Sequence, residues 1–271
     1  MTIKEVLKKY QATDETELFL SHLLKCSKED LFLDPNRLVN QGQISLLEAM
    51  IKQLNKGQPA AYILGYKYFY NLKFKVDSST LIPRPESEWL VEKALEFINK
   101  TPEQKLNVLD IGTGSGCLAI SIAKHTNPTL VKITASDISR KALEVAKTNA
   151  RTHKVHVNFI YSDLLEKLPD SYDLIIANLP YVPVTDYNKF HANLKHEPIS
   201  ALTDGTDNFI LYEKLLEQLK SRQNLPSMVI FELDPKTKPA LEDLLKSYLP
   251  QASITFHKDL QGLWRYAILQ S

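Results

Sequence analysis

The chain has 271 residues, of which 44% are hydrophobic and 24% are charged, as is typical of a soluble globular protein. This composition excludes an intrinsically disordered chain, a collagen-like chain and a disulfide-rich scaffold. The 33 Lys and Arg residues nearly balance the 32 Asp and Glu residues, so no global basic field points to a nucleic-acid partner. The length allows one large domain or two ordinary ones.

The first hundred residues are predicted to be mainly helical, with one hairpin. The expected elements are a helix that follows the acidic start at 14–17, a helix over 45–54, a β-hairpin over 66–76, an extended segment over 81–85 and a helix over 86–98. The hairpin is indicated by large apolar and polar residues that alternate around Asn71. Pro83 and Pro85 keep the next segment extended, because a proline biases the residue before it away from the helical region.

After a polar break over 99–102, strands and helices alternate. Strands are predicted over 107–111, 131–136, 157–161, 173–177, 227–233, 252–257 and 263–269, and helices over 117–124, 139–152, 208–221 and 236–248. Short apolar runs that alternate with helices favour a parallel sheet covered on both faces. Only residues 258–262 join the last two strands, too few for a crossover helix, so this pair is expected to be antiparallel.

A glycine cluster lies between the first of these strands and its helix. Gly112, Gly114 and Gly116 are three of only eight glycines in the chain. Such a turn presents backbone N–H groups and a helix N-terminus to a ligand. The dinucleotide-binding spacing G-x-G-x-x-G would need a glycine where Cys117 stands. The observed spacing, after Asp110, fits S-adenosylmethionine better, because this ligand has no pyrophosphate to bind; a turn without a ligand is the alternative.

Two further residues support the ligand interpretation. Asp137 ends the next strand, about 20 residues beyond the glycines, where an acid commonly binds ribose hydroxyls. By itself it could equally cap the helix that follows. Leu164 follows the third strand and is expected to lie beside the adenine ring.

The fourth strand ends in Asn178-Leu179-Pro180-Tyr181, which indicates the chemistry. A planar amide or exocyclic amine is a poor nucleophile because its nitrogen lone pair is delocalised. The Asn178 side-chain oxygen and a backbone carbonyl can accept its two N–H groups, while the proline stiffens the turn and the tyrosine ring stacks on the planar group. In-line placement against a methyl sulfonium then supplies most of the catalysis, and no strong general base is required. A simple turn at a strand end is the alternative.

These motifs together resemble the HemK/PrmC family, which methylates the glutamine of the Gly-Gly-Gln motif in peptide-chain release factors. The resemblance covers essentially the whole chain and is carried by residues 59–65, 81–88, 110–116, 137, 178–181, 196–198 and 201–202. It implies cofactor contacts at Gly112, Thr113, Gly114, Ser115, Gly116, Asp137, Leu164 and Asn178. It also implies glutamine binding by Asn178, Leu179 through its carbonyl, Pro180 and Tyr181, with Asn178, Pro180 and Tyr181 as the catalytic residues.

The fold that we expect is a class I S-adenosylmethionine-dependent methyltransferase, with a Rossmann-like seven-stranded sheet whose last strand pair is antiparallel. The predicted domains are a helical N-terminal substrate-recognition domain over 1–64, a β-hairpin and extended linker over 65–84 and a methyltransferase domain over 85–271. By the same resemblance, Arg84 and Glu88 line the site or form an ion pair at the domain junction.

The sequence departs from the family pattern at three positions. Leu179 replaces the usual proline, Ser87 replaces a threonine but keeps its hydroxyl, and Leu164 stands where some relatives carry an aromatic residue. Asn-Leu-Pro-Tyr is also found in ribosomal-RNA adenine dimethyltransferases, so an RNA or DNA adenine N6-methyltransferase is the alternative function. The absence of a clustered basic patch is evidence against it. A non-catalytic adaptor would not need both the glycine turn and Asn178.

The remaining expectations concern the cell and its ligands. The histidines and the two cysteines do not combine at metal-ligand spacings, so no metal site is predicted. The N-terminus has no signal-peptide character, and no apolar run reaches the roughly 18 residues of a membrane span. We therefore expect a cytoplasmic monomer with a protein partner, the release factors, and no direct contact with nucleic acid or membrane.

Overall fold

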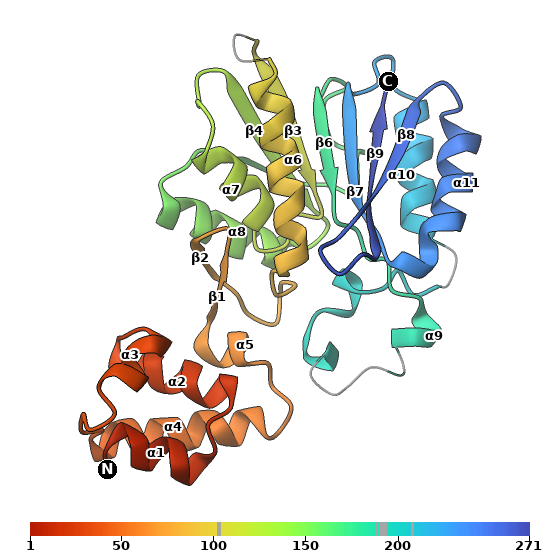
Figure 1. The fold of residues 1–271 in the computed structure, drawn as a ribbon. Helices are drawn as coiled ribbons and strands as arrows, with labels where there is room; N and C mark the ends of the chain where they lie inside the picture. The colour runs from red at the N-terminus through yellow and green to blue at the C-terminus, as the bar shows by residue number, and fades with distance from the viewer. Residues whose placement is uncertain (102–103, 188, 190–193, 207–208) are drawn as a thin grey trace. The chain divides into compact units, whose positions relative to one another are not determined.

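The computed structural model describes residues 1–101, 104–187, 189, 194–206 and 209–271. The chain divides into two compact units, of which one contains Met1–Gly65 and the other begins at Tyr66 (Figure 1). Two residues of predicted segments, Pro102 in the polar break and Asn208 at the start of a helix, lie outside the described residues.

Residues 1–65 form a helical unit. Its helices are α1 (Ile3–Tyr10), α2 (Asp14–Leu24), α3 (Lys28–Leu33), α4 (Gln41–Leu54) and α5 (Ala60–Leu64). The helices α1, α3 and α4 each begin with a capping box, and their N-cap residues are Thr2, Ser27 and Asn40. In a capping box the N-cap side chain accepts the backbone N–H of the residue three positions later, and the side chain of that residue accepts the N-cap backbone N–H. Phe19 and Leu47 are fully buried in the core between these helices.

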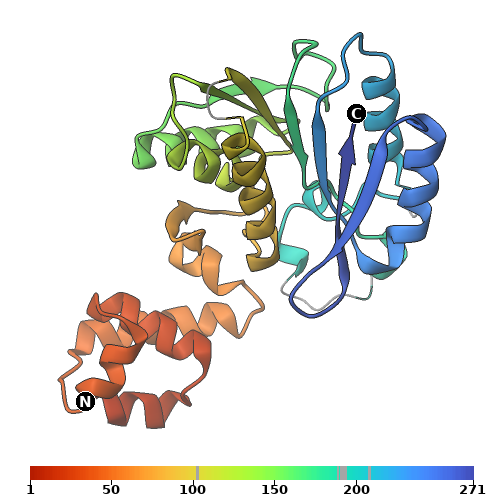
Figure 2. The same cartoon turned by 45° about the horizontal axis from the view of Figure 1, so that its top comes forward.

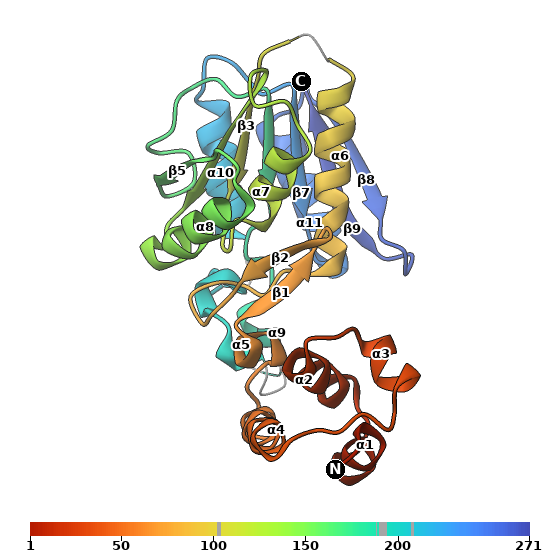
Figure 3. The ribbon, with the colours of Figure 1, turned by 90° about the vertical axis from the view of Figure 1, so that its left-hand side faces the viewer.

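The hairpin after this unit has strands β1 (Tyr66–Phe69) and β2 (Leu72–Lys75), paired antiparallel from Tyr66↔Lys75 to Phe69↔Leu72. Tyr70 and Asn71 form the two-residue turn, with φ of +48° and +57°. Two positive φ values in succession are the requirement of a type I′ turn, and asparagine tolerates them well. The hairpin predicted over 66–76 is therefore present. In Figure 3 it is drawn below α6 and α7.

The larger unit is built on a seven-stranded sheet with the order β5-β4-β3-β6-β7-β9-β8. Its strands are β3 (Leu106–Ile111), β4 (Val131–Asp137), β5 (Asn158–Tyr161), β6 (Leu174–Ala177), β7 (Met228–Glu232), β8 (Ser253–Lys258) and β9 (Trp264–Gln270). Strands β3 to β7 are parallel, whereas β9 runs antiparallel to both β7 and β8. The predicted class I methyltransferase sheet is confirmed.

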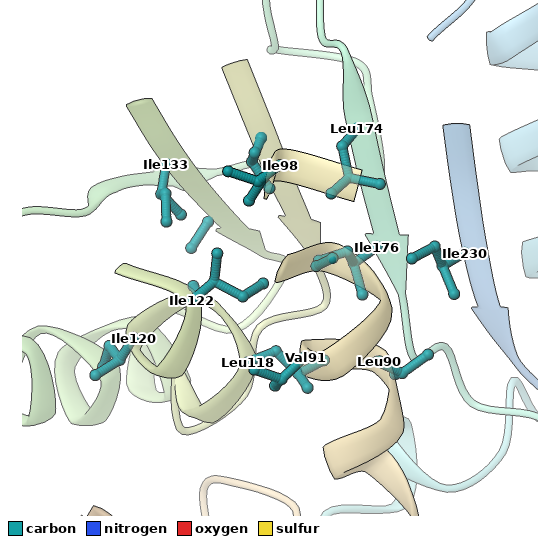
Figure 4. Close-up of a cluster of buried hydrophobic side chains, with 14 of the residues drawn as sticks. Leu90, Val91, Ile98, Leu118, Ile120, Ile122, Ile133, Leu174, Ile176 and Ile230 are labelled. Atoms are coloured by element: carbon teal, nitrogen blue, oxygen red, sulfur yellow. The ribbon is translucent and has the colours of Figure 1, made fainter. Parts of the chain in front are cut away.

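Helices cover both faces of this sheet (Figures 1 and 2). They are α6 (Glu88–Asn99), α7 (Cys117–Lys124), α8 (Arg140–His153), α10 (Ile210–Lys220) and α11 (Lys238–Tyr248); shorter segments are η1 (Pro85–Ser87), α9 (Val184–Tyr187), η2 (Leu194–His196), η3 (Ile199–Ala201) and η4 (Pro235–Thr237). The side chains of β6 alternate between the two layers. Leu174 and Ile176 pack with α6 and α7 (Figure 4), while Ile175 and Ala177 pack with α10 and α11. Burial on both faces explains the continuous apolar runs of the sequence.

The strand order determines where a ligand can bind. Strand β3 lies between β4 and β6. The strands that follow β3 in the chain are added first on one side of it (β4, β5) and then on the other (β6, β7), so the direction in which the sheet grows reverses at β3. In open α/β sheets ligands bind beyond the carboxyl ends of the strands at such a switch point. The loop after β3 and the turn after β6, which carry the two principal sequence motifs, therefore lie beside each other.

Candidate active site

The glycine loop that follows β3 has the backbone conformation that its sequence requires. Gly112, Gly114 and Gly116 have φ of +69°, +55° and +82°. At Gly116 a side chain is also excluded by space, because a Cβ built there would lie 2.8 Å from Ile120 Cδ1 and 3.1 Å from Ala146 Cβ. Glycine at this position lets α7 begin directly against α8.

Asp110 supports this loop from inside the protein. Its Oδ2 accepts hydrogen bonds from the Thr113 hydroxyl at 2.6 Å and from the Ala119 N–H at 3.2 Å, so one carboxyl group joins the loop to the first turns of α7. Among the described residues no group bonds its buried Oδ1. Burial raises the pKa of Asp110 to about 7.

Asp137, the last residue of β4, joins the loop to the next helix. Its Oδ2 accepts the Gly114 N–H at 2.9 Å and its Oδ1 accepts the Ser139 N–H at 2.7 Å. The N-cap of α8 is Ser139, whose hydroxyl accepts the Ala142 N–H, so the alternative role of Asp137 as that cap is wrong. Burial raises the pKa of Asp137 as well.

A cavity of about 330 Å³ opens over these groups. Its wall includes Gly112, Gly114, Asp137, Leu164 and Asn178, which come from the ends of four different strands. The volume lies in the range of about 300–1,000 Å³ that small-molecule sites occupy. Leu164 adopts a φ of +49°, an uncommon value for leucine, and this turn directs the chain along the cavity wall.

The other predicted cofactor residues support the loop from behind. Thr113 is buried, and its N–H donates to the Ser136 carbonyl at 2.9 Å. Ser115 is buried too, and its carbonyl accepts the Asn149 side-chain amide at 2.8 Å. The same Asn149 side chain exchanges two hydrogen bonds with the backbone of Lys75, so strand β2 of the hairpin is tied to the glycine loop.

The Asn178–Tyr181 turn lies at the junction of two hollows. Asn178 and Leu179 line the large cavity and also a smaller one of about 50 Å³, whose wall includes Arg84, Tyr181 and Leu202. Asn178 donates from Nδ2 to the Ser87 hydroxyl at 3.1 Å. Pro180 lines the large cavity, while Tyr181 donates its hydroxyl to Glu232 Oε1 at 3.1 Å.

Arg84 and Glu88 have partners within the larger unit. Arg84 forms an ion pair with the buried Glu197 at 2.5 Å, and Glu197 also accepts the Ile82 N–H at 2.9 Å. Glu88 accepts the Tyr70 N–H at 2.8 Å. The ion pair expected at the domain junction is thus not the one formed: Arg84 pairs within the larger unit and joins the extended 81–85 segment to the segment around residue 197. Each of these two segments borders one or both of the cavities.

Comparison with known proteins identifies the family. Residues 3–65 match the PrmC N-terminal domain and residues 90–218 match the methyltransferase small domain. The chain is 35% identical to the release factor glutamine methyltransferase of Lactococcus lactis over 225 residues, which cover 83% of this chain and 82% of that protein. The chain belongs to the release factor glutamine methyltransferase family. A second member, from Coxiella burnetii, is 36% identical over 256 residues, 94% of this chain and 90% of that protein.

Membership of this family confirms the resemblance that the sequence motifs indicate, and it confirms that the chain is a methyltransferase. A solved structure agrees at the level of the fold. The ribosomal protein L11 methylase of Lactobacillus delbrueckii subsp. bulgaricus has a TM-score of 0.51 and 22% identity, covering 72% of this chain and 83% of that one.

Two further findings complete the description. None of the helices in the described part of the chain has the length and apolar character that a membrane crossing requires. Within the same residues, no three His, Cys, Asp or Glu side chains come together as a metal site would require.

Two site features of this family member escaped the sequence argument. One is Glu197, noted only as part of a motif, which binds Arg84. The other is Glu232, which accepts the Ser87 and Tyr181 hydroxyls. A signal for Glu232 exists in the sequence, because a carboxylate that ends a fully apolar strand needs a buried partner.

Proposed function

We propose that this chain transfers a methyl group from S-adenosylmethionine to the side-chain amide nitrogen of the glutamine in the Gly-Gly-Gln motif of release factors. The observation that carries the proposal is the position of Asn178 at the junction of two cavities. We infer that the larger one holds the cofactor and that the substrate glutamine approaches from the side of the smaller one.

The residues present fit the cofactor. Asp137 keeps lone pairs for ribose hydroxyls, because an ionised carboxylate has about four acceptor sites and only two are used by backbone N–H groups. Gly112 and Gly114 expose their backbone to the cavity, and Leu164 offers it an apolar wall. Thr113, Ser115 and Gly116 shape this loop. S-adenosylmethionine, when bound, supplies an electrophilic methyl group on its sulfonium.

The substrate amide is oriented by the turn after β6. The Asn178 Nδ2 is engaged with Ser87, so its Oδ1 accepts one N–H of the glutamine amide, and the Leu179 carbonyl accepts the other. Held in this way, the nitrogen presents its lone pair to the methyl group rather than to its own carbonyl. The nitrogen gains the methyl group, which leaves S-adenosylhomocysteine, a neutral thioether, as the second product. The alkylated nitrogen then releases one proton to water, and because alkylation makes this proton acidic, no strong base is needed. Pro180 stiffens the turn, and Tyr181 is held by Glu232.

The helical unit is proposed to recognise the release factor. It matches the PrmC N-terminal domain and exposes large apolar side chains, among them Phe32, Leu33 and Leu38. Exposed apolar residues that gather on one small unit are typical of a protein-binding surface. The hairpin that follows, within the proposed linker over 65–84, connects this unit to the catalytic domain over 85–271.

Mass spectrometry of a purified release factor, incubated with the enzyme and S-adenosylmethionine, tests the proposal. We expect a gain of one methyl group on the Gly-Gly-Gln peptide and none when this glutamine is replaced by asparagine. Methylation of adenine in RNA or DNA, with no gain on the release factor, would overturn the proposal in favour of the alternative enzyme.

Asn178→Ala tests the proposed chemistry within the same assay. We expect methyl transfer to be lost while the Kd for the cofactor, measured by isothermal titration calorimetry, changes only a few-fold, because the substitution removes an acceptor for the substrate. Undiminished turnover in this variant would contradict the positioning role of Asn178.

A further inference from the structure

We propose that Glu232 is a positioning residue which, acting through the Ser87 hydroxyl, sets the orientation of the Asn178 side-chain amide. The proposal rests on the proposed function of Asn178 as the acceptor for the substrate amide. The three residues lie in separate elements of the larger unit: Glu232 ends β7, Ser87 is in η1 and Asn178 follows β6.

We call the two hydrogen bonds that join Glu232 to Ser87 and Ser87 to Asn178 the relay, and they have a definite direction. Glu232 is 1% exposed, and its Oε2 lies 2.6 Å from the Ser87 Oγ. An ionised carboxylate can only accept, so the single hydroxyl proton of Ser87 points to Glu232. The length is that of a hydrogen bond to a charged oxygen. Ser87 is thereby left with lone pairs only for its second partner, 3.1 Å away on Asn178.

This direction selects one of the two orientations of the Asn178 amide. Its Nδ2 must face the lone pairs of Ser87, since the opposite orientation would place two acceptors against each other. The Asn178 Oδ1 is then the atom available to the substrate. A glutamine amide nitrogen carries two N–H donors, so it needs an acceptor at this place. With the Asn178 amide reversed, donor would face donor and the substrate nitrogen could not be held.

The second oxygen of Glu232 acts on the other end of the same turn. Oε1 accepts the Tyr181 hydroxyl at 3.1 Å, so one carboxylate holds the last residue of the Asn178–Tyr181 turn directly and the first residue through Ser87. The backbone carbonyl of Glu232 is held in turn by the Tyr212 hydroxyl at 2.7 Å. Each hydrogen bond that orients the carboxylate comes from a buried or half-buried group, which limits its freedom to rotate.

Protonation of Glu232 should reverse the relay. A neutral carboxyl can donate to Ser87, and the Ser87 proton is then free to turn to Asn178. Burial raises the pKa of Glu232 from its ordinary value, while Ser87, Tyr181 and Arg265 oppose the rise. The titratable or charged groups that face it are Glu86 in η1, Cys117 at the start of α7, Tyr181 after β6, Tyr212 in α10, and Arg265 and Tyr266 in β9.

Glu232→Gln and a pair of changes at Ser87 test this inference with the full-length enzyme. The Glu232→Gln side chain has a single oxygen for the two hydroxyls, of Ser87 and Tyr181, that the carboxylate accepts, so we expect kcat to fall about 10- to 100-fold, the effect of losing one well-placed hydrogen bond. We expect the cofactor Kd to stay within about threefold of the wild-type value. Ser87→Ala should lower kcat to a similar extent, whereas Ser87→Thr, which keeps the hydroxyl, should retain it.

Three readouts separate positioning from a merely structural role. The double variant of Ser87→Ala and Glu232→Gln should be no slower than the slower single variant, because both break the same relay. Because protonation of Glu232 should reverse the relay, we expect kcat of the wild type to fall towards acid pH and Glu232→Gln to lack this fall. If Glu232→Gln does not fold, the contrast between alanine and threonine at Ser87 decides.

The outcomes distinguish this inference from the proposed function. Full activity in both Glu232→Gln and Ser87→Ala, together with an inactive Asn178→Ala, would overturn the relay and leave the proposed function standing. Full activity in Asn178→Ala would overturn the proposed function of Asn178, and with it the relay.

Discussion

Replacement of Gly116 by alanine tests the conformation and packing of the glycine loop together. Gly116 has a φ of +82°, and a Cβ at this position would lie 2.8 Å from Ile120 Cδ1 and 3.1 Å from Ala146 Cβ. Both neighbours are fully buried. Ile120 can rotate its terminal methyl group away, but Ala146 has no rotatable side chain to move. The substitution therefore adds a strained backbone to a contact with Ala146 that side-chain rotation cannot relieve.

The two costs can be estimated separately. A left-handed conformation costs a residue with a side chain about 1–2 kcal/mol, and an extra methyl group in a well-packed core costs about 1–3 kcal/mol. We expect the free energy of unfolding to fall by about 2–5 kcal/mol in all. Gly205→Ala is a matched control, because Gly205 has a φ of +85° but no atom within 4 Å of its built Cβ. This variant should lose only the backbone share.

Urea unfolding followed by tryptophan fluorescence measures the difference in unfolding free energy between Gly116→Ala and Gly205→Ala, and it reports on the larger unit. The protein has two tryptophans, Trp89 and Trp264, and both belong to the larger unit. Their signal reports the unfolding of the unit that holds Gly116. Equal losses in Gly116→Ala and Gly205→Ala would refute the packing argument, and no loss in either would refute the backbone argument too.

Two more predictions concern the buried carboxyl groups of the site. Asp137→Asn keeps one oxygen for the backbone but removes the charge, so we expect the cofactor Kd, measured by calorimetry, to rise about 10- to 100-fold; unchanged affinity would contradict the ribose assignment. Because burial raises the pKa of Asp110 to about 7, the native state keeps a proton there that the unfolded chain releases above about pH 4. Stability should then fall as pH rises from 4 to 7, by up to about 1.4 kcal/mol for each pH unit from Asp110 alone, and Asp110→Asn should make the slope smaller. Asp137 and Glu232, whose pKa values burial also raises, add to the slope that is left. Urea unfolding at pH 5 and pH 8 checks the sign, and the same slope in both proteins would place its source elsewhere.

The sheet of the larger unit was predictable because its strands are buried on both faces. A strand such as 174–177 has no polar face to interrupt the apolar run, and its observed bounds agree with the prediction to within a residue. The short helices of the N-terminal unit gave a weaker pattern. Ile3–Tyr10 mixes lysines with apolar residues, and Ala60–Leu64 is a single turn after a proline, so neither was predicted. A third short helix, Lys28–Leu33, was not predicted either. Capping signals at Thr2 and Ser27, each three residues before an acid, would have indicated Ile3–Tyr10 and Lys28–Leu33.

The contacts inside the site were less predictable, because they depend on the order of the strands. Ser87 and Glu232 are 145 residues apart in the chain and meet because α6, which follows Ser87 directly, packs against the neighbouring strands β6 and β7. No local pattern contains this information. A hydroxyl at position 87 could be noted from the sequence, but its partner could not be named.

One rule nevertheless connects the polar residues of this site. Asp110, Asp137, Asn178 and Glu232 each stand at or directly after the carboxyl end of a parallel strand. Because these ends share one edge of the sheet, polar residues there converge on a single place. The first three were recognised because a glycine loop, a ribose-type spacing or a proline turn accompanies them. Glu232 has no such companion, yet it stands at the same position on its strand and is as deeply buried as Asp110. A buried acid at a strand end should therefore be treated as part of the site even when no motif surrounds it, and the kinetics of Glu232→Gln measure whether that rule holds here.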